Sequence, residues 1–287
     1  RDAREFAAQL RLTLFPEVES LFAPLAGGFR RLLDRASPAL VCGTLLLLPN
    51  IAAGIFNFYY NETQILSKYP QMRPTFGTLA TVVNLVAYPA ALALALWAIR
   101  PLRRSVFQDS NDGRSPPAFD GEEMERTASR CWSLGHVIAA IGGGFWTLAG
   151  VVYPLTLKAL FPEFAAADMG HFFLSLLICG GVAWTLPFFL GTLLGLFHYY
   201  PRLLRRTLRD DRFRERRRIA ERRSAAYVLA AALIPLSAAA LHSLRSAPST
   251  AIVLAALAVT AGGLFLGLRV YRTVQQKLEM LQAFLES

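Results

Sequence analysis

The stretch WSLGHVIAAIGGGFWTLAGVVYPLTL, residues 132–157, decides the fold class, because it runs for 26 residues without Lys, Arg, Asp or Glu. A second stretch of the same kind covers residues 171–199. A helix needs roughly 20 residues, at about 1.5 Å each, to cross a hydrocarbon layer about 30 Å thick. Both stretches are therefore predicted to be transmembrane helices.

Apolar residues are concentrated in blocks over the whole chain, which is 54% hydrophobic and 17% charged. Soluble domains are roughly 45–50% apolar and 25% charged. Six blocks are long enough to span, at residues 38–60, 76–99, 132–157, 171–199, 225–243 and 249–271. The fifth is short and rich in Ala, and if it did not cross, the topology after it would invert. The sequence predicts an all-α, polytopic membrane helix bundle of about six transmembrane helices.

The basic residues indicate the orientation of these helices. Of the 30 Lys and Arg residues, 26 lie before the first block, in residues 100–130, in residues 201–223 or in residues 269–287, at the end of the sixth block and in the tail. The other four are Lys68, Arg73, Lys158 and Arg245. Because Lys and Arg near helix ends are retained in the cytoplasm, we expect both termini inside and a multi-pass protein of the cell inner (plasma) membrane.

Three regions are expected on the cytoplasmic side. Residues 1–37 have the apolar stripe of an amphipathic juxtamembrane segment. The transmembrane domain, 38–271, contains cytoplasmic loops at 101–130, helix-forming after Asp120, and at 201–223. The remaining residues, 272–287, are predicted to form a cytoplasmic helical tail. The spacing of its Val and Leu residues suits a helical stalk or a homodimer contact; these residues are Val274, Leu278, Leu281 and Leu285.

The loop PRLLRRTLRDDRFRERRRIAERR, residues 201–223, contains eleven arginines. It is expected to lie against anionic headgroups, which attract each basic residue by about 1 kcal/mol. The simplest interpretation is a topology determinant; a specific lipid or nucleotide site is the alternative. Nucleic acid is not an expected partner, because Phe213 is the sole aromatic residue available for stacking. The headgroup candidates are Arg205, Arg206, Arg209, Arg216, Arg217 and Arg218.

Polar residues inside the apolar blocks are the candidates for function, because no nucleotide-binding, metalloprotease or serine-hydrolase motif is present. Whether the chain is part of an enzyme stays open, and no cofactor is predicted. Asn50, Asn57 and Asn61 are spaced by seven and four residues, so they share one helix face. They predict either packing of the first span on the second through buried amides or a ligand-sensing pocket open to the outside. The ligand-sensing candidates are Asn50, Asn57, Asn61, Glu62, Asn84 and Tyr88.

The four histidines lie at two depths. His171 and His242 are predicted near the outer face, where Asp168 and Glu163 could complete a metal or proton site. His136 and His198 are predicted near the cytoplasmic face, and two such levels are typical of bis-imidazole haem ligation. The alternative is that each half-polar ring lies at an interface without a ligand. The three cysteines are expected to be small buried apolar residues.

The first residues, Asp2 to Leu10, read DAREFAAQL. This pattern resembles the last helix of bacterial Hanks-type serine/threonine protein kinase domains, which often close with A-x-E-F-A-x-x-L. The resemblance implies that the chain is the C-terminal membrane region of a receptor-like kinase whose catalytic domain precedes residue 1. None of the family's catalytic motifs occurs here, so it assigns no catalytic residue.

The sequence as a whole predicts the membrane-anchoring and sensory domain of a bacterial signalling protein, coupled to a cytoplasmic output domain outside this chain. Two alternatives stay open. One is a small-solute transporter or permease subunit, which requires a polar route through the membrane. The other is a haem-binding membrane redox subunit.

Overall fold

The structure, a computed structural model, describes residues 36–102, 121–207, 212–243 and 250–286. Most of the predicted juxtamembrane segment, residues 1–35, lies outside the described residues. The described residues form an all-α bundle, and no strand occurs among them. Its long helices are α4 (Pro38–Gln64), α5 (Arg73–Ala98), α7 (Gly121–Leu160), α8 (Ala166–Leu194), α10 (Phe213–Ser243) and α11 (Thr250–Glu286).

Each long helix covers all or most of one of the six apolar blocks, which confirms the predicted all-α fold class. Over the described residues, four stretches are long and apolar enough to cross a membrane: 39–68, 70–98, 122–160 and 166–204. Crossing by α10 and α11, and the orientation of the bundle, stay predictions.

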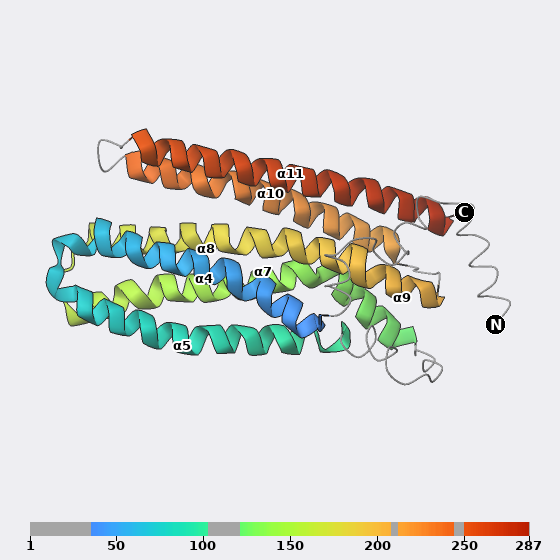
Figure 1. The fold of residues 1–287 in the computed structure, drawn as a ribbon, viewed down its shortest axis with the longest axis horizontal. Helices are drawn as coiled ribbons and strands as arrows, with labels where there is room; N and C mark the ends of the chain where they lie inside the picture. The colour runs from blue at the N-terminus through green and yellow to red at the C-terminus, as the bar shows by residue number, and fades with distance from the viewer. Residues whose placement is uncertain (1–35, 103–120, 208–211, 244–249, 287) are drawn as a thin grey trace.

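Local sequence signals set the first hairpin. The Ser37 hydroxyl accepts a hydrogen bond from the Leu40 amide at 3.2 Å, and Pro38 occupies the first turn, so α4 begins with a side-chain cap. Beyond its C-terminal end, two short 3-10 helices, Leu66–Lys68 and Pro70–Met72, reverse the chain into α5. This tight turn places α4 and α5 side by side and antiparallel (Figure 1).

Glycines bring α7 and α8 into close contact. A Cβ atom at Gly135 would lie 2.2 Å from the Phe188 carbonyl oxygen, and one at Gly195 would lie 2.1 Å from the Cys131 carbonyl oxygen. A Cβ at Gly191 would lie 2.7 Å from the Gly135 Cα. We call Gly135, Gly191 and Gly195 the glycine seam. Small residues of this kind allow membrane helices to approach closely.

The α10–α11 hairpin packs against α8, on the side of the bundle opposite to α5 (Figure 1). The Tyr227 ring of α10 stacks on the Phe188 ring of α8, with centroids 3.6 Å apart and planes inclined by 2°. Ile234 of α10 covers Gly181 of α8. Aromatic stacking and small-residue contacts therefore attach the hairpin.

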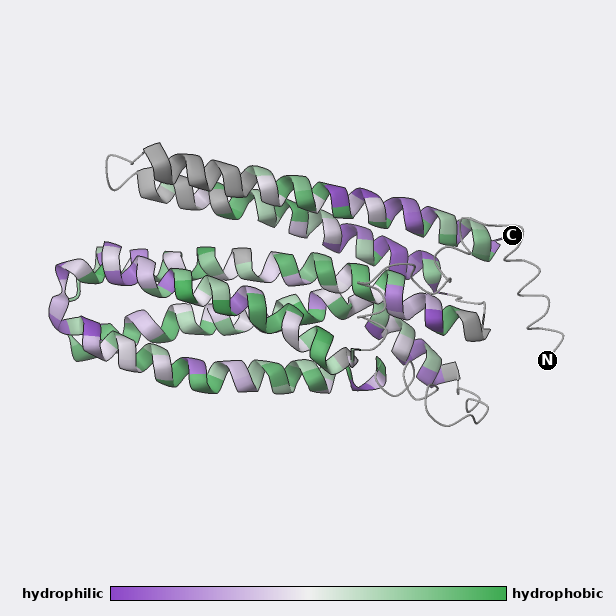
Figure 2. Cartoon of the chain, viewed as in Figure 1, coloured by the Kyte–Doolittle hydropathy of each residue, from purple (hydrophilic) through white to green (hydrophobic). Residues whose placement is uncertain are grey.

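Large apolar side chains cover the outside of the bundle, as expected for helices that face lipid. Leu48, Leu85 and Phe265 are each at least 66% exposed. Figure 2 shows hydrophilic residues gathered at one end, over the first turns of α10 and the last turns of α11. Under the predicted orientation this is the cytoplasmic end.

The stretch predicted as a cytoplasmic loop, 201–223, is largely helical. A π-helical turn at Gly195–Tyr199 leads into α9, Tyr200–Thr207, and α10 begins at Phe213. Its residues pack on the start of α7, where Trp132 makes edge contacts with the rings of Tyr200 and Phe213 at 5.3 and 5.4 Å. The charge count did not predict this packing, because the apolar residues of this stretch are spread among arginines.

The tail is helical, as its spacing predicts, and continues α11. Val274, Leu278 and Leu281 are at most 1% exposed, and Leu285 is partly buried against the same core. The apolar stripe that suggested a homodimer contact is therefore packed within the chain. A homodimer stays a prediction, but it would need another surface.

Candidate functional site

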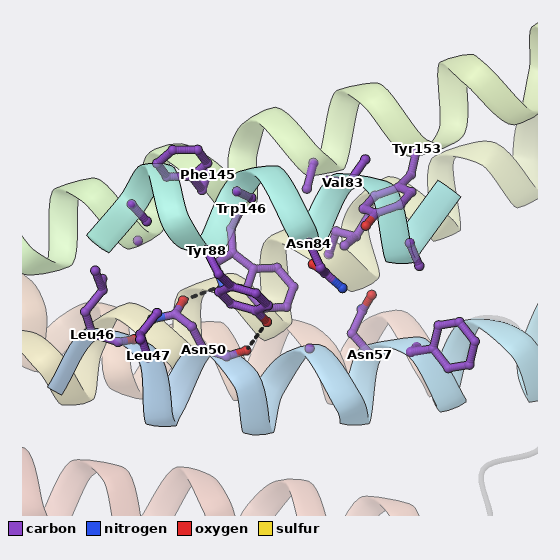
Figure 3. A pocket seen from close by; sticks show the side chains of 18 of the residues that line it. Leu46, Leu47, Asn50, Asn57, Val83, Asn84, Tyr88, Phe145, Trp146 and Tyr153 are labelled. Carbon is purple, nitrogen blue, oxygen red and sulfur yellow. Dashed lines mark hydrogen bonds between the residues drawn. The ribbon is translucent and has the colours of Figure 1, made fainter. Parts of the chain in front are cut away.

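A pocket lies between α4, α5 and α7, lined mainly by residues within 46–58, 76–91 and 142–153 (Figure 3). Its cavity volume is about 90 Å³, which is room for several waters. Four of the predicted ligand-sensing residues line it: Asn50, Asn57, Asn84 and Tyr88. The pocket is lined by apolar and uncharged polar residues, with no Lys, Arg, Asp, Glu or His among them.

Asn50 is the best-bonded polar residue of the pocket and is 6% exposed. Its Oδ1 accepts a hydrogen bond from the Trp146 indole N–H of α7 at 2.7 Å. Its Nδ2 donates to the Leu46 carbonyl at 2.5 Å, and its own carbonyl accepts a longer bond, 3.4 Å, from the Tyr88 hydroxyl of α5. Asn50 thus joins three helices at the base of the pocket.

Asn57 and Asn61 connect α4 to α8. Asn61 donates to the Asn57 Oδ1 at 2.8 Å and accepts from the Ser175 hydroxyl of α8 at 2.8 Å. Asn57 Nδ2 donates to the same hydroxyl at 3.4 Å. The shared asparagine face therefore binds mainly α7 and α8, whereas its spacing suggested packing on α5. Asn61 and Glu62 do not line the pocket.

Two polar groups of the pocket have no hydrogen-bond partner within the described part of the chain. One is the Asn84 amide of α5, which is exposed, and the other is the Tyr153 hydroxyl of α7. Figure 3 shows the Asn84 and Asn57 side chains pointing toward one another across the gap between α5 and α4, with Tyr153 beside them. Unpaired amide and hydroxyl groups at membrane depth are costly, so this gap has unused capacity for a polar ligand.

Two of the residues predicted for a metal or proton site at the outer face, Asp168 and His171, form hydrogen bonds with other side chains of the chain. Asp168 accepts from Lys68 Nζ at 2.9 Å and from the Tyr69 hydroxyl at 3.0 Å. The His171 Nε2 lies 2.9 Å from the Tyr60 hydroxyl. Among the described residues, no group of three His, Cys, Asp or Glu could hold a metal. His242 lies in α10, but its side chain is outside the described residues.

Glu163, the further acidic residue near this site, is turned toward the short helices after α4. It accepts from the Gln71 side chain at 3.1 Å. Hydrogen bonds from its own backbone amide and from Gln71 hold the pKa of the Glu163 carboxyl below its ordinary value. This hydrogen bond connects Glu163 to the turn between α4 and α5.

Histidines at the other depth also contact tyrosines. His136 Nδ1 of α7 lies 3.2 Å from the Tyr227 hydroxyl of α10. His198 is 6% exposed, belongs to the π-helical turn and contacts the Tyr199 ring edge-on. These contacts give both rings a packing role, and haem ligation stays untested.

Arginines of the 201–223 stretch pair with carboxylates of the chain. Arg216 is 8% exposed, and its Nη2 lies 2.6 Å from Glu125 Oε2 of α7; Arg212 lies 3.4 Å from the other oxygen. Arg217 pairs with Glu221 at 2.7 Å and with Glu279 of α11 at 3.5 Å. We call Glu125, Arg212 and Arg216 the cytoplasmic ion-pair cluster, because they lie at the end of the bundle that is cytoplasmic under the predicted orientation.

The remaining headgroup candidates differ in what the structure describes. Arg218 is exposed and stays available for lipid. The side chains of Arg205 and Arg206, and the whole of Arg209, lie outside the described residues. Contact of this stretch with anionic headgroups stays a prediction.

Sequence reasoning missed the third wall of the pocket, formed by Gly142, Trp146 and Tyr153 of α7. One signal could have found it. Trp in membrane helices is enriched at the two interfaces, but Trp146 falls in the middle of the apolar block 132–157. A mid-block indole N–H needs a buried acceptor, and here Asn50 supplies it.

The site can bind an uncharged group by hydrogen bonds, but within the described residues it presents no charged or metal-ligating group for catalysis. Comparison with known proteins found no matching family model, no matching curated protein and no matching solved structure.

Proposed function

We propose that this chain is a membrane-anchoring sensory domain, in which occupancy of the α4–α5–α7 pocket is passed along α7 to the cytoplasmic end of the bundle. Four helices with the length and hydropathy of membrane spans support anchoring. We also propose that the chain takes part in signalling and is coupled to a kinase-like output domain before residue 1. These two parts of the proposal go beyond that observation.

The observation that carries the proposal is the continuity of α7. This helix runs without interruption from Gly121 to Leu160, which corresponds to about 60 Å. Its outer half supplies Trp146 to the pocket, and its first turns supply Glu125 to the cytoplasmic ion-pair cluster. A displacement of α7 at the pocket therefore reaches Arg212 and Arg216 through one rigid element.

Two neighbouring glycines of α7 offer a matched test. Gly142 lines the pocket, and a Cβ there would lie 3.4 Å from the Asn50 amide atoms, so Gly142→Leu should push α7 away from α4. Gly144 is exposed and a Cβ there meets nothing within 4 Å, so Gly144→Leu should add only lipid contact.

The readout is the distance between spin labels at the cytoplasmic end, measured by double electron–electron resonance in liposomes. Labels are attached at Glu123→Cys on α7 and Arg222→Cys on α10, both exposed positions, after the native cysteines have been replaced. We expect Gly142→Leu to shift the distance distribution and Gly144→Leu to leave it unchanged. Identical distributions in both variants and in the parent would contradict transmission along α7.

Anchoring is tested separately. Extraction of membranes with alkaline carbonate should leave the full chain in the pellet, and release into the supernatant would contradict the membrane assignment.

A further inference from the structure

We propose that the pocket binds an uncharged lipid with a hydroxyl or carbonyl head, which enters sideways from the hydrocarbon core between α4 and α5. This inference deepens the proposed sensory function and rests on it. It names the class of ligand and its route.

The chemistry of the lining selects an uncharged head. The lining contains no ionisable acid or base other than tyrosine hydroxyls. A charged head would lose its hydration without gaining a counter-ion, which is strongly unfavourable in a low-dielectric site. The unpaired Asn84 amide and Tyr153 hydroxyl offer both donors and acceptors. A hydroxyl or carbonyl group satisfies them.

The two ends of the pocket are closed by packed side chains. Toward the α4–α5 turn, Phe58 stacks on Phe76 with ring centroids 5.0 Å apart, and Met72 beyond them is fully buried. Toward the opposite end, Leu46 and Ala95 are each 1% exposed in the main core. Neither end offers a path from water, which also counts against a transport route through this pocket.

The side of the pocket, in contrast, borders the surface that faces lipid. On α5, Asn84 is exposed and is followed directly by Leu85 and Val86, which are 70% and 66% exposed. On α4, Ile51 and Ile55 flank the lining residue Gly54 and are 41% and 56% exposed. A polar amide at the rim of an otherwise apolar surface marks where a lipid head can leave the hydrocarbon and find hydrogen bonds.

The gap is kept open by a small residue. A Cβ atom at Gly54 would lie 2.9 Å from the Tyr88 hydroxyl oxygen, so a larger side chain at this position would press on the far wall. Ala87 of α5 also lines the pocket with a single methyl group. These two positions leave room for the first carbons of an alkyl chain behind a hydroxyl or carbonyl head.

The test is photolabelling of the full chain in phosphatidylcholine liposomes. The probe is hexadecanol with a diazirine near the hydroxyl and a terminal alkyne, and the comparison probe is hexadecyl phosphate with the same tail. We expect saturable labelling by the alcohol within residues 46–58 and 80–91, displaced by unlabelled hexadecanol, and background labelling by the phosphate. Equal labelling by both probes, or labelling that does not saturate, would overturn the proposal.

Adjacent residues on α5 provide the matched variants. Ala87→Trp fills the pocket and should reduce labelling by about tenfold, whereas Val86→Trp points into lipid and should leave it unchanged. Asn84→Leu removes one hydrogen-bonding group from an exposed position, so folding is preserved, and it should weaken competition by hexadecanol about two- to tenfold. Unchanged labelling in Asn84→Leu and in a folded Ala87→Trp variant would refute the site.

The two sets of experiments fail independently. Photolabelling needs no movement of α7, and the spin-label measurement needs no ligand. Labelling without a distance change would support the lipid site and contradict its coupling to the cytoplasmic end. A distance change without saturable labelling would keep the link and reject the uncharged lipid.

Discussion

Replacement of Gly135 by Ala tests the packing on which the bundle depends. The added Cβ would lie 2.2 Å from the Phe188 carbonyl oxygen, 2.4 Å from the Thr192 hydroxyl oxygen and 2.6 Å from the Thr192 amide nitrogen. Ordinary contacts of a Cβ begin near 3.4 Å. Because two of these atoms belong to the backbone of α8, no side-chain rotation relieves the clash, and α8 has to move away by about 1 Å.

The expected cost follows from overpacking a close-packed interior, which destabilises proteins by about 1–3 kcal/mol. Gly144→Ala on the same helix is the control, since a Cβ at Gly144 meets nothing within 4 Å. In an exposed helical position the exchange of Gly for Ala stabilises by up to about 1 kcal/mol. The two variants have the same composition, but their unfolding free energies should change in opposite directions relative to the parent.

The assay is equilibrium unfolding in mixed micelles of dodecyl maltoside and sodium dodecyl sulfate, followed by tryptophan fluorescence. We expect Gly135→Ala to unfold at a lower fraction of dodecyl sulfate than the parent, and Gly144→Ala at an equal or higher fraction. If the unfolding free energies of the two variants agreed within about 0.5 kcal/mol, a difference no larger than ordinary surface substitutions produce, the close approach of α7 and α8 would be wrong.

Three further substitutions or titrations probe the contacts outside the glycine seam. Trp146→Phe leaves Asn50 Oδ1 without its donor, so it should lower the unfolding free energy by about 1–3 kcal/mol in the same micelle assay. The control is Trp97→Phe, at a position 64% exposed, which should change the unfolding free energy by less than about 0.5 kcal/mol. Glu125→Gln removes the charge that faces the buried Arg216 and should destabilise by about 1–3 kcal/mol; Glu122→Gln disrupts only an exposed i,i+4 pair and should cost less than about 0.5 kcal/mol. Hydrogen bonds from Gln282 and Arg214 lower the pKa of Glu286. A depressed folded-state pKa means that this contact stabilises the tail above the ordinary value of 4.5 and is lost as pH falls below it, so an NMR titration should place the Glu286 midpoint below 4.5, and a midpoint at or above 4.5 would contradict the contact.

Hydrophobic block length predicted the helices well because it depends on one physical quantity, the thickness of the hydrocarbon layer. Its predicted bounds for α4, α5 and α8 lie within five residues of the observed ones, but it placed the starts of α7 and α10 eleven and twelve residues too late. Those helices extend through charged residues such as Glu125 and Arg216, which are stabilised by pairing with each other. A hydropathy criterion cannot detect a helix held by ion pairs.

The site was predicted in part. Spacing found Asn50 and Asn57 on one face of α4, and both line the pocket. Spacing within one helix does not say which neighbour that face meets, and the partners turned out to be Trp146 of α7 and Ser175 of α8. Contacts between helices that are about 100 residues apart depend on how the bundle closes, which single-sequence periodicity does not contain.

The place of the pocket follows from how the helices share the packing. In the most apolar stretches of α8 and α7, 53% and 39% of the residues are buried, whereas in those of α4 and α5 the shares are 22% and 17%. Opening a gap between α4 and α5 therefore sacrifices few close contacts, while the glycine seam holds α7 and α8 too closely to separate without losing many. Under the proposed function, we expect a ligand between α4 and α5 to act on α7 by a small shear movement along the seam, since such movements preserve packed interfaces. We propose that such a movement would displace Glu125 relative to Arg216, its ion-pair partner at 2.6 Å.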